Sequence, residues 1–150
     1  MKITKEDLKQ RFDEYNQLYF DSVLPRCEFS VSPLNCLGQY THPKGRNGKR
    51  RCRIWLTSTV EWHEESLKDV LIHEMIHHYV SEIEHRPNMD SFSWYGLFGH
   101  GKRFSRQVKR LKRDYGLKIH IHPHHIYHKH EKIPTTRWGK FVRFIGYNLN

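Results

Sequence analysis

The central segment of the chain is residues 70–84, VLIHEMIHHYVSEIE, which is apolar over much of its helical circumference. A helix with this pattern is usually buried. It also contains His73 and His77 four residues apart, with Glu74 directly after the first histidine. Imidazoles at positions i and i+4 lie on one helix face, about 6 Å apart, so both can bind one zinc ion. The side chain of Glu74 lies beside that face, where its carboxylate can take a proton from zinc-bound water.

The H-E-x-x-H spacing is weak evidence by itself, because 13 histidines make chance matches common. A random occurrence has a probability of roughly 0.07 in a chain of this composition. The alternative interpretation is a pair of hydrogen-bonded core histidines. The apolar surroundings argue against it, because buried imidazoles without a metal would leave polar atoms that are costly to satisfy. We therefore predict a zinc site on this helix.

A catalytic zinc site needs a third protein ligand and an open position for water. A metzincin would supply Gly and then His downstream, but Val80 and Ile83 stand there instead. A gluzincin would supply a downstream glutamate, but the sequence contains none between Glu84 and Glu131. Neither of these two patterns therefore explains the site.

The best candidate for the third ligand is His100. It precedes Phe104 by four residues, so it shares the inward-facing side of a second helix predicted at 101–115. Gly99 and Gly101 flank it and allow the backbone to approach a metal closely. The alternative is a surface histidine that caps this helix.

Sequence patterns also predict how the helices begin and which residues they bury. A capping box at Thr4–Asp7 precedes a helix at 5–20, and a similar signal at Ser66–Asp69 precedes the central helix. A loop is predicted at 87–101, before the second long helix. That helix has a predicted core stripe, which comprises Phe104, Val108, Leu111 and Tyr115.

Alternation of apolar and polar residues predicts strands at 27–32, 38–41 and 51–56. The last two are joined through a basic loop that contains Asn47-Gly48, which favours an antiparallel hairpin. Cys27 and Cys52 lie on the apolar phase of their strands, and we expect both to be small core residues.

Composition limits the class of protein. The 150 residues carry 26 Lys and Arg against 16 Asp and Glu, a net charge of +10, which favours a polyanionic partner such as nucleic acid. No apolar run approaches the ~18 residues of a membrane span, and no apolar stretch follows the N-terminal lysines as a signal peptide would require. Three cysteines without a C-x-x-C pair fit a reducing compartment. We expect a cytoplasmic protein with no membrane partner.

Three separated motifs resemble those of the SprT-like metalloproteases, a family that includes bacterial SprT and the eukaryotic Spartan protease. The motifs are HEMIH at 73–77, GHGKRF at 99–104 and YNQLYFDSVLP at 15–25. The segments 38–40 and 54–56 also fall where that family has its small sheet. The resemblance covers residues 5–117 of the chain.

The resemblance implies a zincin-like α+β fold, with a small antiparallel sheet packed on the central helix. It implies one catalytic zinc held by His73, His77 and His100, with Glu74 as the catalytic acid and base. Eukaryotic members cleave proteins crosslinked to DNA and are stimulated by DNA. We therefore expect a zinc endopeptidase whose partners are a protein substrate and single-stranded or damaged DNA, which fits association with the nucleoid. The protease domain is expected at 1–118, with 119–150 as a C-terminal extension packed on it.

The chain departs from many relatives because no cysteine follows Cys52, so we expect no cysteine zinc ribbon to supply DNA contacts. Basic residues elsewhere are then the candidates. They are Lys44, Arg46, Lys49, Arg50, Arg51 and Arg53 on the hairpin, Lys102, Arg106, Lys109 and Arg113 on the second helix, and Lys140 and Arg143 among Trp138, Phe141 and Phe144 in the tail. Phosphate neutralisation and base stacking would bind single strands without sequence preference. The alternative is a set of solvated charges, with the tail aromatics packed on the domain.

Two other functions fit the same residues. One is a non-enzymatic, zinc-stabilised DNA-binding module, whose fourth zinc ligand would come from Glu84 or from the histidine-rich segment 120–130. The other is a zinc hydrolase that acts on small peptides. We expect the segment 120–130 to be a polar strand or loop face, and we assign no role to His78 and His85, which lie off the metal face.

Overall fold

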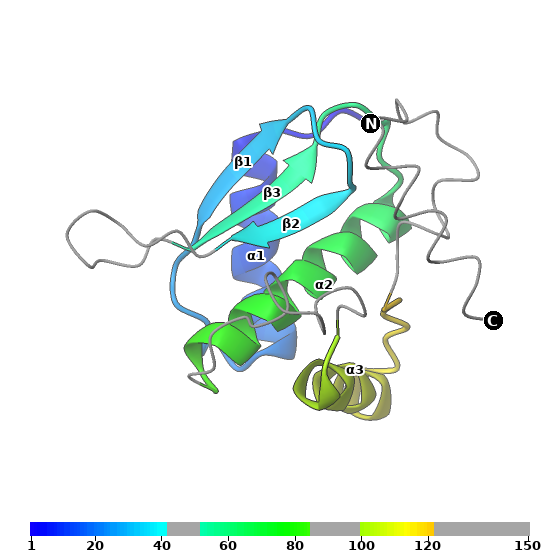
Figure 1. Ribbon diagram of the computed structural model, residues 1–150. Coiled ribbons are helices and arrows are strands. Elements are labelled where there is room, and N and C mark those ends of the chain that lie inside the picture. Colours follow the sequence, from blue (N-terminus) through cyan, green and yellow to red (C-terminus); the bar gives the residue numbers. More distant parts are fainter. Residues whose placement is uncertain (42–51, 85–99, 122–150) are drawn as a thin grey trace.

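The computed structural model describes residues 1–41, 52–84 and 100–121 (Figure 1). In chain order the elements are α1 (Lys5–Tyr19), β1 (Glu28–Ser32), β2 (Gly38–Thr41), β3 (Arg53–Thr57), α2 (Glu64–Glu82) and α3 (Lys102–Tyr115). The predicted α+β class is confirmed. The hairpin loop at 42–51, most of the loop predicted at 87–101 and the tail from 122 onward lie outside the described residues. Within the described ranges, no helix is long and apolar enough to cross a membrane.

The capping box predicted for α1 is present. The Thr4 hydroxyl accepts a hydrogen bond from the backbone N–H of Asp7 at 3.1 Å, and the Asp7 carboxylate accepts one from the Thr4 N–H at 2.8 Å. The helix buries Leu8, Phe12 and Tyr15. A cap that satisfies two backbone donors therefore sets where α1 begins, and its apolar stripe sets which face turns inward.

The start predicted for α2 is wrong. The helix begins at Glu64 with His63 as its N-cap, so Ser66 is the third helical residue and not the cap. The Ser66 hydroxyl accepts a hydrogen bond from the His63 backbone N–H at 3.3 Å. Glu64 and Glu65 occupy the first turn, where negative charge favours a helix N-terminus. The extra turn places Asp69 inside the helix, on the same element as the histidines.

The three strands form a mixed sheet in the order β1-β3-β2. β2 and β3 pair antiparallel, as the hairpin prediction required. β1 pairs with β3 in parallel, from Glu28 opposite Arg53 to Ser32 opposite Thr57, so the expectation of an antiparallel sheet is wrong for this pair. β1 and β3 are parallel because β3 lies between the other two strands and is antiparallel to β2. The connection at 33–37 leaves room for β3 between β1 and β2.

The helices pack in two layers beside this sheet (Figure 1). α1 packs on β1, where the ring of Phe12 meets the ring of Phe29 edge-on with centroids 5.2 Å apart. α2 crosses below β2, and six of its apolar side chains are fully buried: Leu67, Val70, Leu71, Ile72, Met75 and Ile76. α3 packs against α2 on the side away from the sheet. α2 is therefore enclosed by the sheet, α1 and α3, as its all-round apolar pattern predicted.

The inward face of α3 differs in part from the predicted stripe. Phe104 and Leu111 are buried as predicted, and Val108 is partly buried. Gln107 is buried as well, whereas Tyr115 is 40% exposed. Tyr115 is the last residue of the helix and meets Tyr19 edge-on, with ring centroids 5.3 Å apart. The end of α3 therefore rests on the end of α1 and not in the core.

Gly38 marks the closest approach of the sheet to α2. A Cβ atom built on Gly38 would lie 2.8 Å from Glu74 Oε1, 2.8 Å from Val70 Cγ1 and 2.9 Å from Leu56 Cδ2. All three atoms belong to buried side chains, which have little room to move. A residue without a side chain is therefore required where β2 passes over α2.

We expect Gly38→Ala to lower the free energy of unfolding by about 1–3 kcal/mol, because the added methyl group overpacks this contact. Urea denaturation would measure the loss. The matched control is Gly101→Ala, where nothing lies within 4 Å of the added Cβ. The control should lose about 0.5 kcal/mol, the difference between Gly and Ala at an N-cap. Equal losses in the two variants would contradict the close-approach argument.

Candidate metal centre

Three histidines from two elements converge on one point. His73 and His77 lie one turn apart on α2, and His100 lies just before α3. One ring nitrogen from each lies within 4.8 Å of the others, and Nε2 of His73 is 3.0 Å from Nε2 of His100. Two imidazoles on a tetrahedral zinc have their nitrogens roughly 3.3 Å apart, given Zn–N bonds of 2.0–2.1 Å. The structure therefore brings together the three predicted ligands in a geometry that fits one zinc ion.

The orientation of His73 is set by the segment after α3. Its Nδ1–H donates to the backbone carbonyl of His120 at 3.0 Å, which leaves the lone pair of Nε2 facing the cluster. His120 is in turn held by Asp69, whose carboxylate accepts from the His120 backbone N–H at 3.0 Å and from its Nδ1–H at 2.6 Å. Metal-binding histidines commonly donate their second ring N–H to a carbonyl or carboxylate in this way.

His77 is also in the form that a metal requires. Burial, together with a smaller effect of the neighbouring His73, lowers its pKa to about 3. The ring is therefore neutral near pH 7 and keeps a lone pair for a ligand bond. Phe104 packs against all three histidines, with its ring centroid 4.8, 4.7 and 4.2 Å from those of His73, His77 and His100. This aromatic contact holds the imidazoles at the α2–α3 interface.

Glu74 lies on the sheet side of the same helix turn. Its side chain is buried, and burial raises its pKa to about 8, although a hydrogen bond with the backbone of Tyr40 acts in the opposite direction. A carboxyl group with a pKa near neutrality can both accept and return a proton at physiological pH. The site thus combines three imidazoles with one proton-exchanging carboxyl group.

Glu84, one of the two candidates for the fourth ligand of a structural zinc site, has other partners. Its carboxylate accepts from Arg103 Nη1 at 2.7 Å and from Gln107 Nε2 at 3.2 Å, and it lies 3.6 Å from Arg106 Nη2. These contacts tie the end of α2 to α3. Among the residues that the structure describes, the metal-binding group at this point contains the three histidines alone. Within this described part of the chain, an ion bound by the three histidines would keep an open position, which is typical of a catalytic zinc.

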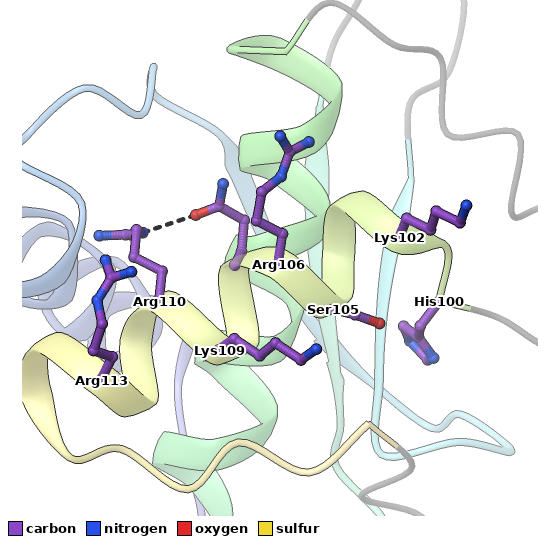
Figure 2. A pocket seen from close by; sticks show the side chains of 8 residues that line it. His100, Lys102, Ser105, Arg106, Lys109, Arg110 and Arg113 are labelled. Atoms are coloured by element: carbon purple, nitrogen blue, oxygen red, sulfur yellow. Dashed lines mark hydrogen bonds between the residues drawn. The ribbon is translucent and has the colours of Figure 1, made fainter.

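The basic residues predicted on α3 line one groove. Figure 2 shows Lys102, Arg106, Lys109 and Arg113 along the exposed side of α3, together with Arg110 and with His100 at one end. The groove has a volume of about 770 Å³. Lys44, Arg46, Lys49, Arg50 and Arg51 lie outside the described residues, as do the candidates in the tail. Arg53 pairs with Glu28 and lies 5.1 Å over the ring of Trp55, so it belongs to the sheet surface.

Two residues of the site were missed by sequence reasoning, Asp69 and His120. Asp69 looked like part of a helix cap, and His120 looked like one member of a polar histidine-rich segment. The role of His120 at His73 depends on its backbone carbonyl, which no sequence pattern marks. The one sequence signal for Asp69 was its position four residues before His73, which places the two side chains on the same helix face.

We expect Asp69→Ala to weaken zinc binding about 10–100-fold, because His120 and then His73 lose their fixed positions. Competition with a fluorescent zinc chelator would measure the affinity. Glu65→Ala is the matched control, since it removes an exposed acid from the same helix. An unchanged affinity in Asp69→Ala would show that this contact does not position the ligand.

The motifs of the site agree with a known family. A sequence model described as the SprT-like family matches residues 8–128, which include all three histidines, Glu74, Asp69 and His120. No curated protein is similar enough to the chain to add to this comparison. Membership of the family suggests a zinc metalloprotease-type function. On the length of this match, the chain belongs to the SprT-like family.

Proposed function

We propose that this protein is a zinc-dependent endopeptidase that acts on proteins bound or crosslinked to DNA. One observation carries the proposal: His73, His77 and His100 converge with their nitrogens within 4.8 Å, and the buried carboxyl group of Glu74 lies on the same helix turn. Three histidine ligands, an open fourth position and an adjacent carboxyl group are the parts that metal-assisted hydrolysis requires.

A zinc ion bound by the three histidines would supply a Lewis acid that acidifies water and polarises the scissile carbonyl. Glu74 takes the proton of the attacking water and returns it to the leaving amine. The backbone of Tyr40 and the close contact with Gly38 hold its carboxyl group in place for both transfers. Asp69 and His120 keep the Nδ1–H of His73 directed away from the ion.

The position of β2 supports an extended polypeptide as the substrate. β2 is an edge strand of the three-stranded sheet, and Tyr40 of this strand bonds to Glu74 through its backbone. An extended peptide that pairs with a sheet edge gains backbone hydrogen bonds whatever its side chains. A peptide on β2 would bring its backbone next to the proton-exchanging group.

Replacement of Glu74 tests the proposed chemistry. We expect Glu74→Gln to bind zinc as the wild type does and to cleave a DNA-binding protein at least 10²-fold more slowly, the usual contribution of a general base. Metal analysis and gel-based cleavage would measure the two quantities. Glu65→Gln, an exposed change on α2, should keep full activity, and His100→Ala should lose the zinc.

Wild-type cleavage by zinc-loaded Glu74→Gln would refute the role of Glu74. No cleavage by the zinc-loaded wild type would favour a non-enzymatic zinc module. Cleavage of short peptides alone, with no cleavage of intact proteins, would instead favour a small-peptide hydrolase. Each result therefore selects one of the three functions that the sequence permits.

The proposal of DNA as partner depends on the groove along α3. Its lining includes six basic or imidazole side chains, namely His100, Lys102, Arg106, Lys109, Arg110 and Arg113. Lys102 and Lys109 are exposed, and the whole chain carries a net charge of +10. A charged groove of this kind can track a phosphate backbone. Because His100 lies at one end, a strand bound there would hold DNA-associated proteins close to the metal centre (Figure 2).

We expect single-stranded DNA to bind with an affinity that falls steeply with salt. Replacing both Lys102 and Lys109 by Ala should reduce the slope of log affinity against log salt by about 1.4, or roughly 0.7 per lost phosphate contact. Titration of a fluorescent oligonucleotide at several salt concentrations would measure it. The control replaces Lys5 and Lys9, two exposed lysines of α1. Identical slopes for the two double variants would remove α3 as the DNA-binding face.

A further inference from the structure

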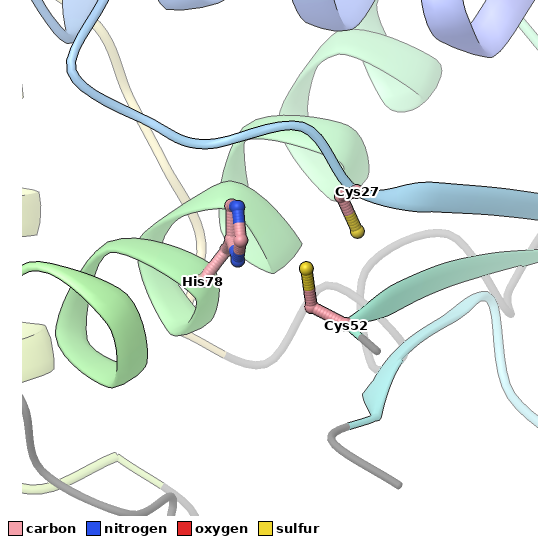
Figure 3. Close-up of side chains that lie close together, drawn as sticks. All are labelled: Cys27, Cys52 and His78. Atoms are coloured by element: carbon pink, nitrogen blue, oxygen red, sulfur yellow. The ribbon is translucent and has the colours of Figure 1, made fainter. Parts of the chain in front are cut away.

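A second cluster of metal-binding side chains lies on the other side of α2. Cys27, Cys52 and His78 each offer one ligand atom, and these three atoms lie within 4.8 Å of one another. Figure 3 shows their side chains pointing toward a common point between α2 and the sheet. Cys52 and His78 are buried and Cys27 is half-buried. This cluster shares no residue with the histidine site.

The fold brings these residues together by two independent means. Cys27 directly precedes β1 and Cys52 directly precedes β3, so the parallel register that pairs Glu28 with Arg53 also sets the cysteines side by side. A hydrogen bond of 2.9 Å from the Glu28 N–H to the Cys52 carbonyl extends the pairing to this point. His78 follows His77 by one residue, a turn of about 100° around the helix, and therefore faces the sheet when His77 faces α3.

The hydrogen bonds of His78 leave one nitrogen suited to a metal. Its Nε2 lies 2.8 Å from the carbonyl oxygen of Pro25, which can only accept, so Nε2 carries the proton. Nδ1 then has the lone pair, and it accepts from the Tyr40 hydroxyl at 3.3 Å. A ring N–H directed at a backbone carbonyl is the usual arrangement around a metal-bound histidine, because it fixes the tautomer.

We propose that Cys27, Cys52 and His78 bind a second zinc ion, which links the residues just before β1 and β3 to α2. Two thiolates and one imidazole form a donor set that zinc prefers, with four ligands in tetrahedral geometry. A bound ion would take the Nδ1 lone pair of His78 in place of the Tyr40 hydroxyl, and a water molecule would complete the four positions. On binding, the two thiols release their protons to the solvent.

Such an ion would stabilise α2 on the face that is turned toward the sheet. Within the described residues, the sheet contributes Cys27 and Cys52 to the ion and α2 contributes His78, which adjoins the proposed catalytic ligand His77 in the chain. The ion would therefore restrain the helix turn that carries the histidine site. The first site contains no sulfur, so the two sites can be told apart by spectroscopy.

Cobalt substitution tests the proposal without any measurement of cleavage. The full chain is reduced with a phosphine, stripped of metal and titrated with Co²⁺ under nitrogen. We expect two equivalents to bind and a thiolate-to-cobalt charge-transfer band to appear in the near ultraviolet. Cys52→Ser should lose the band and one equivalent, whereas Cys36→Ser, the matched cysteine control outside the cluster, should keep both. His100→Ala should keep the band and lose the other equivalent.

Several results would overturn the proposal. They are the absence of the band in the reduced wild type, its persistence in Cys52→Ser, or its loss in Cys36→Ser. A disulfide between Cys27 and Cys52 that forms in air, with no band after its reduction, would identify the pair as a redox couple and not as metal ligands.

A second measurement on the wild type covers the case in which Cys52→Ser does not fold. Zinc should protect Cys27 and Cys52 from alkylation at least tenfold relative to chelated protein, as mapped by peptide mass. Cys36 should react at the same rate in both samples. If zinc leaves the alkylation rate of every one of the three cysteines unchanged, the second site is contradicted.

Discussion

The structure depends on hydrogen-bond partners for four ionisable side chains that are buried on one helix. Asp69, His73, Glu74 and His78 are all within α2 and each is at most 5% exposed. A buried polar group without a partner costs about 1–3 kcal/mol, so four of them without partners would cost as much as many domains have in total stability. Each is instead paired by a neighbour of the helix: Asp69 and His73 by His120 in the segment after α3, Glu74 by β2, and His78 by the connection before β1. The contacts that satisfy these side chains are therefore also contacts that assemble the fold around α2.

This arrangement follows from the rotation of the helix by about 100° per residue. His73 and His77 face α3, Glu74 faces β2, and His78 faces the start of β1 and β3. Adjacent residues thus serve different sites, which explains why a segment of six residues can carry three histidines and a glutamate without mutual interference. It also explains why α2 must be enclosed on all sides, since every face carries either an apolar side chain or a polar one that needs a partner.

Local sequence patterns were sufficient for α1, for α3 and for the proposed metal ligands, but not for the start of α2. The period of apolar residues predicted α1 and α3 within one residue at each end, and the phase shared with Phe104 directed His100 to the histidine pair.

The pairing of strands that are distant in the sequence could not be predicted from such local patterns. Alternation shows which face of a strand is buried but not which strand lies beside it, so the parallel partner of β1 was missed. The grouping of Cys27 and Cys52 with His78 follows from that pairing and was missed for the same reason. The Asp69–His120 contact spans 51 residues, and His120 reaches His73 through a backbone carbonyl, which has no sequence signal.

Contacts with Glu84 connect the inner face of α3, which packs on the histidines, with its outer face, which carries the basic groove. On the inner face Phe104 packs on the three histidines, and Gln107 binds Glu84 at the end of α2. Arg106 lies 3.6 Å from the same Glu84 carboxylate and also lines the basic groove. A phosphate group in the groove would compete with Glu84 for Arg106 and would leave Arg103 and Gln107 to hold the α2–α3 junction. A ligand changes a site only when it binds two arrangements of the protein with different affinity, and competition for a shared arginine supplies such a difference. A phosphate group on α3 would therefore act on the α2–α3 junction through the pairing of Arg106 with Glu84.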